Sequence, residues 1–181
     1  MREMVQDLKD RNVTLVADPY WPDRYEHEQH RIQDVASNGL LGVFHVGSTA
    51  IPDVPGKPAL DIIAVYDDED AMMTGIERLT DDDRYEREAG STVSIRWADA
   101  CAVFIKAHTS GDEKVASQLL FRDYLRENQE ARARYARVKQ EAAKTHPADL
   151  EAYTTAKSEV VRSILEQARD EGYDESLPEI V

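Results

Sequence analysis

The chain has 181 residues, 41% of them hydrophobic, and this length suits one globular domain whose core needs no disulfide or metal to hold it together. It carries 36 Asp and Glu against 22 Lys and Arg. The resulting net charge of −14 disfavours bulk binding of nucleic acid, which depends on cations that neutralise phosphates. No apolar run approaches the roughly 20 residues of a membrane span, and the start, MREMVQDLKD, lacks the apolar segment of a signal peptide. We therefore expect a cytoplasmic protein with no membrane partner.

The acidic residues are spread along the chain, and arginine outnumbers lysine, 15 to 7. Dispersed acidity with few lysines keeps a protein hydrated in concentrated salt, so one interpretation is a halophilic source. The other interpretation is an ordinary acidic bacterial protein. The single cysteine, Cys101, excludes an internal disulfide, and its apolar neighbourhood, ACAVFI, predicts a buried, inert thiol.

The first part of the chain predicts a mixed sheet with helices on it. Residues 1–12 predict a frayed or loosely helical start, and VTLVA predicts a short strand. A helix is predicted to begin at Trp21-Pro22-Asp23 and to stop at Asn38-Gly39. LLGVFHV and ALDIIAVY predict two buried strands, and AMMTGIERLTDD predicts a helix. STVSIRW and CAVFIKAH predict two more strands, antiparallel about a turn at residues 98–100.

The second part is helical. Apolar residues recur at helical spacing over 115–144, Pro147 interrupts the pattern, and residues 148–171 predict another helix. The acidic tail, 172–181, is predicted to be loosely held. The fold class is therefore α/β (α+β), with a mixed-sheet core over about 13–110 and a C-terminal helical pair over about 115–171. No Gly/Ser linker separates the two parts, so residues 1–181 are expected to form a single domain.

The stretch HVGSTAIPDVPGKPALDII joins the first two buried strands by a loop of small and kinked residues. Gly47, Ser48 and Thr49 either cradle an anion or form a tight turn whose hydroxyls cap the next segment. Lys57 either reaches a phosphate or lines the loop. Asp61 lies inside an apolar strand, where a carboxylate must be paired or bound. It is therefore either a ligand or metal contact, or the partner of Lys57, Arg96 or Lys106.

Further candidate residues lie on the later strands and helices. Arg96 and Lys106 are expected to flank Asp61 and, with Arg122, to form a positive pocket that attracts an anionic ligand. Arg122 and Arg126 are four apart and share a helix face, where they either bind that ligand or fasten the helices to the sheet. His45 is expected to be a core histidine with its hydrogen bonds satisfied. The Tyr-x-x-x-Lys pairs at 135/139 and 153/157 are typical of packing with a lysine stem that reaches outward.

Four segments resemble the GrpB family, an uncharacterised protein family: YWPDRYEHE, FHVGSTAIPDVPGKPALDI, LLFRDYLRENQEARARYARVKQEAA and YTTAKSEVVRSIL. The resemblance spans about Val13 to Gln167 and implies a fold of the nucleotidyltransferase-like superfamily. The resemblance also implies that Lys157 lines the pocket. That superfamily uses a Gly-Ser turn, a strand with Asp-x-Asp and a third acidic residue to hold two Mg²⁺ ions. Gly47-Ser48 matches the turn and Asp61 matches the first carboxylate.

The remaining acidic positions are missing, because Ile63 occupies the second and CAVFIKAH contains no acid for the third. We therefore expect an uncharacterised GrpB-family protein that binds a nucleotide or other phosphorylated small molecule in a cleft at the GST loop. The alternative is an active, divergent Mg²⁺-dependent nucleotidyltransferase acting on a small acceptor. That alternative makes Asp61 a metal ligand and requires a carboxylate from another segment, for which Glu28 and Asp99 are the candidates.

Overall fold

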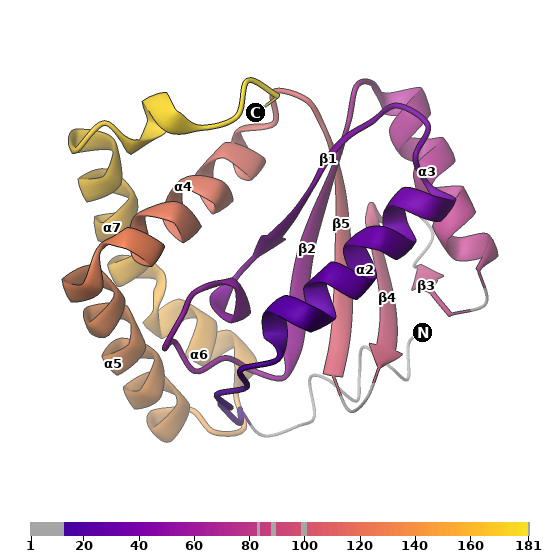
Figure 1. The fold of residues 1–181 in the computed structure, drawn as a ribbon. Helices are drawn as coiled ribbons and strands as arrows, with labels where there is room; N and C mark the ends of the chain where they lie inside the picture. Colours follow the sequence, from indigo (N-terminus) through magenta and orange to yellow (C-terminus); the bar gives the residue numbers. More distant parts are fainter. Residues whose placement is uncertain (1–12, 83, 88–89, 99–100, 181) are drawn as a thin grey trace.

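A computed structural model describes residues 13–82, 84–87, 90–98 and 101–180 (Figure 1). Its centre is one mixed sheet of five strands in the order β1-β2-β5-β4-β3. The strands are β1 (Leu40–Val46), β2 (Ala59–Tyr66), β3 (Glu86–Arg87), β4 (Val93–Ala98) and β5 (Cys101–Thr109). The strands predicted at ALDIIAVY and at the antiparallel pair STVSIRW and CAVFIKAH are confirmed.

Helices cover both faces of this sheet (Figure 1). One face packs on α2 (Trp21–Val35) and α3 (Glu69–Asp81) through a core that includes Ile32, Ile62 and Ile76. The other face meets the helical half of the chain, and Val115 and Leu119 pack on Ile63 and Val65. The helices of that half are α4 (Glu113–Glu127), α5 (Gln129–Thr145), α6 (Leu150–Ala156) and α7 (Ser158–Asp170).

Strand β2 lies inside the sheet and decides which residues face the helical half. It pairs antiparallel with β1 and parallel with β5, and Asp61 lies opposite Phe104 of β5. Since successive side chains of a strand point to opposite faces, Leu60 and Ile62 enter the core under α2 and α3. Asp61 and Ile63 point to the face that carries the helical half. The alternation therefore places the one carboxylate of β2 between sheet and helices.

The helical half is divided more finely than the periodicity predicts. The expected helix over 115–144 is broken at Asn128, which leaves helical geometry and accepts a hydrogen bond from the Ala131 amide. Asn is a favoured N-cap, and here it ends one helix and begins the next. The expected helix over 148–171 is interrupted at Lys157, which closes α6 and opens α7.

Two expectations near the ends of the chain are wrong. No strand forms at VTLVA in the described part of the chain, where the segment makes a single bridge from Val16 to Gly56. The tail is not loosely held as far as Ile180. Tyr173 and Leu177 pack on the helical core, and the Ile180 carbonyl accepts hydrogen bonds from the Ser110 hydroxyl (3.0 Å) and the Gly111 amide (3.3 Å). Residues 1–12, predicted to be frayed or loosely helical, lie outside the described residues.

Among the described helices, none has both the length and the apolar character that a bilayer crossing requires.

Candidate functional site

The GST turn lies directly against Asp61. Gly47 has φ +72°, and a Cβ at this position would come within 2.8 Å of Asp61 Oδ2. Only glycine tolerates both the backbone geometry and the close approach. Ser48–Ala50 form the short 3₁₀ turn η1, and Ser48 Oγ lies 3.5 Å from the Tyr135 hydroxyl of α5. The turn therefore joins the end of β1, the carboxylate of β2 and the helical half at one point.

Four of the seven lysines of the chain surround this carboxylate. Lys106 of β5 forms an ion pair with Asp61, with 2.8 Å between Nζ and Oδ1. The others come from separate segments: Lys57 from the loop before β2, Lys139 from α5 and Lys157 from the α6–α7 junction. We refer to Ser48, Asp61, these four lysines and the adjacent Tyr135 and Tyr153 as the lysine site.

Two tyrosine rings of the helical half contact three of these lysines. The Lys157 ammonium lies 3.8 Å from the centre of the Tyr153 ring, and the Lys57 ammonium lies 5.9 Å from the same ring. The Lys139 ammonium lies 5.4 Å from the centre of the Tyr135 ring. These are cation–π contacts, which attract a cation without neutralising its charge.

Burial and mutual repulsion lower the pKa of these lysines. Burial, with Lys157 and Lys57 nearby, lowers the pKa of Lys139 to about 7. Burial and Lys57 lower the pKa of Lys157 to about 8, and burial also lowers the pKa of Lys57. In the described part of the chain, Asp61 is the carboxylate that raises these pKa values. One carboxylate against four ammonium groups leaves the site positive in a protein of net charge −14.

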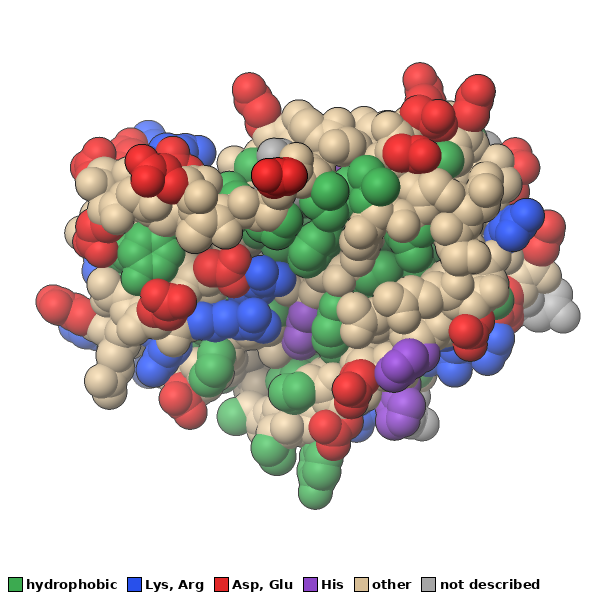
Figure 2. Space-filling model, turned by 45° about the horizontal axis from the view of Figure 1, so that its top comes forward, with side chains coloured by type: hydrophobic (Ala, Val, Ile, Leu, Met, Phe, Trp, Pro, Cys, Tyr) green, Lys and Arg blue, Asp and Glu red, His purple; other side chains and the backbone are tan. Residues whose placement is uncertain are grey.

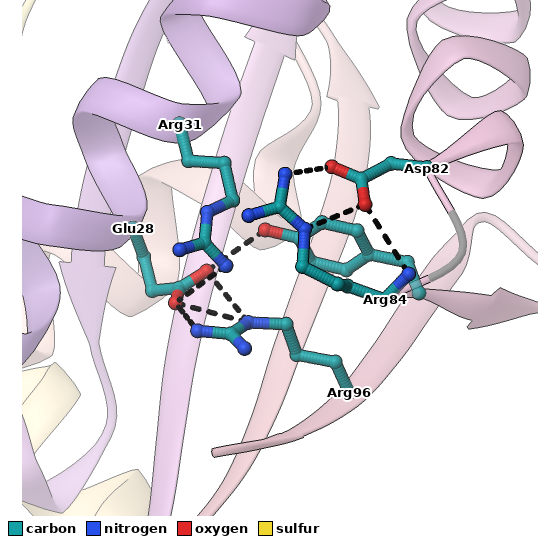
Figure 3. Close-up of polar contacts among 6 residues, drawn as sticks. Glu28, Arg31, Asp82, Arg84 and Arg96 are labelled. Atoms are coloured by element: carbon teal, nitrogen blue, oxygen red, sulfur yellow. Dashed lines mark hydrogen bonds and ion pairs between the residues drawn. The ribbon is translucent and has the colours of Figure 1, made fainter.

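Arg96 does not lie beside Asp61, so that expectation is wrong. Arg96 pairs in register with Val103, whose side chain belongs to the core under α2, and it points to the opposite face of the sheet. There it binds the buried carboxylate of Glu28 on α2, to which the Tyr85 hydroxyl also donates at 2.8 Å (Figure 3). Glu28 is therefore occupied and cannot complete a carboxylate set with Asp61. Asp99, the other candidate acid, lies outside the described residues.

Arg122 and Arg126 do lie together, but at the exposed edge of β1. Arg122 binds Asp123 through two hydrogen bonds, at 2.6 and 2.9 Å, and donates to the His45 carbonyl at 3.2 Å. Arg126 donates to the Ala50 carbonyl at 2.8 Å. Both arginines line a pocket on the Thr49 side of η1, whereas Ser48 faces the lysine site. The predicted ligand-binding residues are thus divided between two places.

His45 is a satisfied core histidine, as predicted. Its Nε2 lies 2.9 Å from the Thr49 hydroxyl, and its ring stacks on Tyr25 at 5.0 Å between centroids. Burial and the nearby Arg126 lower its pKa to about 4, so the ring is neutral near pH 7. Cys101 is buried as predicted, and burial raises the pKa of its thiol to about 11.

The side chains around Asp61 do not fit the magnesium that the superfamily implies. Magnesium binds carboxylates and phosphate oxygens, but the Asp61 carboxylate already binds the Lys106 ammonium. The described residues contain no group of three or more His, Cys, Asp or Glu placed to hold a metal ion. Three further ammonium groups near Asp61 would repel a divalent cation.

Sequence reasoning missed three members of the lysine site: Lys139, Tyr135 and Tyr153. Lys139 is only 1% exposed, and no carboxylate among the described residues lies within ion-pair distance of it. The signal available in the sequence was the repeated Tyr-x-x-x-Lys spacing, which usually reports packing. These two pairs differ from ordinary packing pairs because they lie near Lys57 and Asp61 in the folded protein. Both residues are far from the two pairs in the sequence.

Comparison with known proteins supports the fold and gives the family. The sequence profile described as GrpB protein matches residues 12–167. A UPF0157 protein of Halalkalibacterium halodurans is 32% identical over 177 residues, covering 91% of this chain and 87% of the relative. The crystal structure of the conserved protein GrpB from Enterococcus faecalis superimposes with a TM-score of 0.74 at 24% identity, covering 89% of this chain and 99% of that one.

More distant structures share the fold alone. A STING-associated CdnE c-di-GMP synthase from Capnocytophaga granulosa has a TM-score of 0.55 at 10% identity, over 91% of this chain and 70% of the synthase. The mixed sheet with helices on both faces is a nucleotidyltransferase-like fold. With the profile match over most of its length and the close UPF0157 relative, the chain belongs to the GrpB family.

Proposed function

We propose that this protein binds a nucleotide or another phosphorylated small molecule at the lysine site. The observation that carries the proposal is the gathering of four of the seven lysines around one carboxylate in a protein of net charge −14. Lys139 is buried and the other three lysines are half-buried, and cations held away from water in excess of anions are costly unless something pairs with them. A phosphate group supplies the missing negative charge, and its binding would favour the protonated form of Lys139 and Lys157.

The kinds of side chain present support a phosphate in particular. Lysine ammonium groups act as point charges that bind phosphate in many proteins. The Ser48 and Tyr135 hydroxyls, which lie beside each other at η1, supply further hydrogen-bond donors. The surplus of positive charge, which a bound anion would increase by protonating Lys139, suits a group with several negative charges better than a single carboxylate. The nucleotidyltransferase-like fold supports a nucleotide within this wider class.

The same residues argue against a requirement for metal. Ammonium groups occupy the surroundings of Asp61 where the superfamily uses divalent cations. We therefore expect phosphate binding in the presence of EDTA and assign no transfer step to the protein. Magnesium-dependent transfer, the alternative drawn from the family resemblance, finds no group of three or more His, Cys, Asp or Glu among the described residues that could hold the metal.

Thermal unfolding with ADP, ATP, inorganic pyrophosphate and adenosine tests the proposal, each with EDTA and with Mg²⁺. A ligand at a hundred times its Kd adds about 2.7 kcal/mol. For a chain of this size that raises Tm by about 5–10 °C. We expect the three phosphates to stabilise the protein in EDTA and adenosine to have no effect. Lys139→Met should abolish the shift, whereas Lys144→Met, an exposed lysine on the same helix, should keep it.

Asp61→Asn separates the two interpretations. If lysines bind the phosphate, removal of the one nearby carboxylate strengthens ADP binding at pH 6.5 by roughly fivefold, the factor that about 1 kcal/mol gives. If a metal ion on Asp61 binds it, the same change abolishes binding and wild-type binding requires Mg²⁺. A folded wild-type protein that none of the three phosphates stabilises, in EDTA or Mg²⁺, would refute the proposal.

A further inference from the structure

A cavity of about 720 Å³ lies at the edge of β1, on the other side of η1 from the lysine site. Its walls include Trp21 and Tyr25 of α2, His45 of β1, Ile51 after η1, and Arg122 and Arg126 of α4. We refer to it as the β1-edge pocket. Its volume falls within the range of small-molecule sites in proteins, about 300–1,000 Å³. On the face shown in Figure 2, Lys and Arg side chains gather beside a histidine in a hollow near the middle of the view.

The turn η1 separates this pocket from the lysine site. Two consecutive hydroxyls point to different places: Ser48 lies near Tyr135, and Thr49 bonds with the His45 ring at 2.9 Å. Thr49 and Ala50 then line the β1-edge pocket. The β1-edge pocket and the lysine site therefore lie on different sides of η1 and draw their charged side chains from different segments. A ligand in the β1-edge pocket does not depend on phosphate binding at the lysine site.

The larger part of the pocket wall is apolar and includes a pair of stacked rings. Tyr25 stacks on His45 with 13° between the rings, and the Tyr25 hydroxyl donates to the Val43 carbonyl at 2.7 Å. Because His45 is neutral near pH 7, this stack carries no charge. Trp21 and Ile51 are buried to 6% and 3% exposure and complete the apolar surface. Such walls favour a planar ring, which packs on aromatic faces with little loss of conformational entropy.

Arg126 gives the pocket one cation with spare hydrogen-bonding capacity. Its Nε is fixed by the Ala50 carbonyl, and its Nη1 lies 3.9 Å from Asp123, beyond hydrogen-bonding distance. Asp123 instead binds Arg122 through two hydrogen bonds. Burial and the neighbouring Arg122 lower the pKa of Arg126, so a nearby anion would be favourable. A planar guanidinium matches a carboxylate through two parallel hydrogen bonds.

The charge of the lining also differs from that of the lysine site. Asp18 and Asp53 line the same pocket, so its two acids balance its two arginines. A polyphosphate would gain little in such a pocket, whereas a singly charged group bound at Arg126 would fit. We infer that the β1-edge pocket binds a small aromatic carboxylate, with its ring between Trp21, Tyr25 and Ile51 and its carboxylate on Arg126.

Calorimetric titration tests this inference with benzoate, 4-hydroxybenzoate and indole-3-carboxylate, each paired with its neutral primary amide. We expect at least one acid to bind, with its amide at least tenfold weaker. Arg126→Gln should weaken the acid at least tenfold. Arg137→Gln, an exposed arginine on α5, should leave its affinity unchanged. Lys139→Met should also leave it unchanged, because the lysine site is separate.

A second measurement does not rely on an arginine variant. The chain contains two tryptophans, Trp21 in the pocket wall and Trp97 on β4, so each indole N–H gives its own signal in a ¹⁵N-resolved spectrum. The bound ring should shift the Trp21 signal and leave the Trp97 signal in place. The inference is overturned if none of the three acids binds. It is equally overturned if Arg126→Gln binds as wild type, if Lys139→Met removes binding, or if the Trp21 signal does not move.

Discussion

At the scale of single residues, Lys139 is the most informative side chain of the protein. It is 1% exposed, and its ammonium is held by the Tyr135 ring and repelled by Lys157 and Lys57. Burying a charge without a counter-ion destabilises the folded state, and a cation–π contact offsets only part of that. The residue therefore opposes folding near neutral pH, which is unusual unless a ligand uses the charge.

The prediction at this scale concerns stability against pH. The folded pKa of Lys139, about 7, lies below the ordinary lysine value of 10.5, so the unfolded chain binds more protons between these pH values. The destabilisation is complete below pH 7 and disappears as the pH rises towards 10.5, by at most about 1.4 kcal/mol per pH unit. Lys139→Met should be more stable than wild type at pH 6, and the difference should shrink at pH 9.

Urea unfolding at pH 6, 7.5 and 9 measures this difference, with Lys144→Met as the exposed control on α5. The control should follow wild type at every pH. If Lys139→Met is instead less stable than wild type at pH 6, the lysine contributes to the fold through its ring contact, and a role in ligand binding loses its main support.

At the scale of elements, the buried carboxylate of Glu28 on helix α2 binds side chains from the sheet half of the chain. Glu28 is 2% exposed and accepts hydrogen bonds from Arg96 of β4 and from the Tyr85 hydroxyl, while Arg31 of the same helix lies 3.8 Å away (Figure 3). These contacts tie α2 to two segments that are distant in the sequence. Removing one member of a buried ion pair leaves the other charge without compensation.

We therefore expect Glu28→Gln to lower the free energy of unfolding by about 3 kcal/mol. Glu26→Gln, at an exposed position on the same helix, should change it by less than about 0.5 kcal/mol. Guanidinium unfolding followed by far-UV circular dichroism measures both. Equal stabilities of the two variants would show that the Glu28 contacts contribute nothing net to the folded state. ADP binding should survive in both variants under conditions where they are folded.

The bounds of the strands and helices show how much of the fold could be predicted from the sequence. Strand β2, Ala59–Tyr66, was predicted to the residue because an apolar run bounded by Pro58 and an acidic turn leaves few alternatives. The placement of the GST turn beside Asp61 followed, since the turn joins two neighbouring strands. The breaks at Asn128 and Lys157 were not predicted, because apolar spacing continues across both.

The side of the sheet that each residue faces could not be read from the sequence. Arg96 and Lys106 lie on adjacent antiparallel strands, and only the register Arg96–Val103 shows that they point to opposite faces. If the pairing of these two strands were shifted by one residue, Arg96 and Lys106 would point to the same face of the sheet. Lys139 was missed for a related reason, since its role depends on Lys57 and Asp61, which are close to it only in the folded chain.

At the scale of the whole molecule, the net charge of −14 predicts a dependence on salt. Like charges on a folded surface repel, and salt screens them over a Debye length that falls from about 10 Å at 0.1 M to 3 Å at 1 M. We expect Tm to rise by several degrees between 0.1 and 2 M KCl at pH 7.5. The rise should largely vanish near pH 4.7, where the net charge approaches zero. A Tm that does not change with KCl at pH 7.5 would count against adaptation to high salt.

The origin of the four lysines in separate segments has a consequence for synthesis on the ribosome. The sheet half of the chain emerges first and carries Lys57, Asp61 and Lys106, whose two cations and one anion leave a surplus of one positive charge. Lys139 and Lys157 follow only with α5 and the α6–α7 junction. A nascent chain therefore acquires most of the positive surplus of the lysine site only after α5 and the α6–α7 junction have been synthesised. If the lysine site binds a phosphate as proposed, such a compound would also favour the packing of the helical half on the sheet.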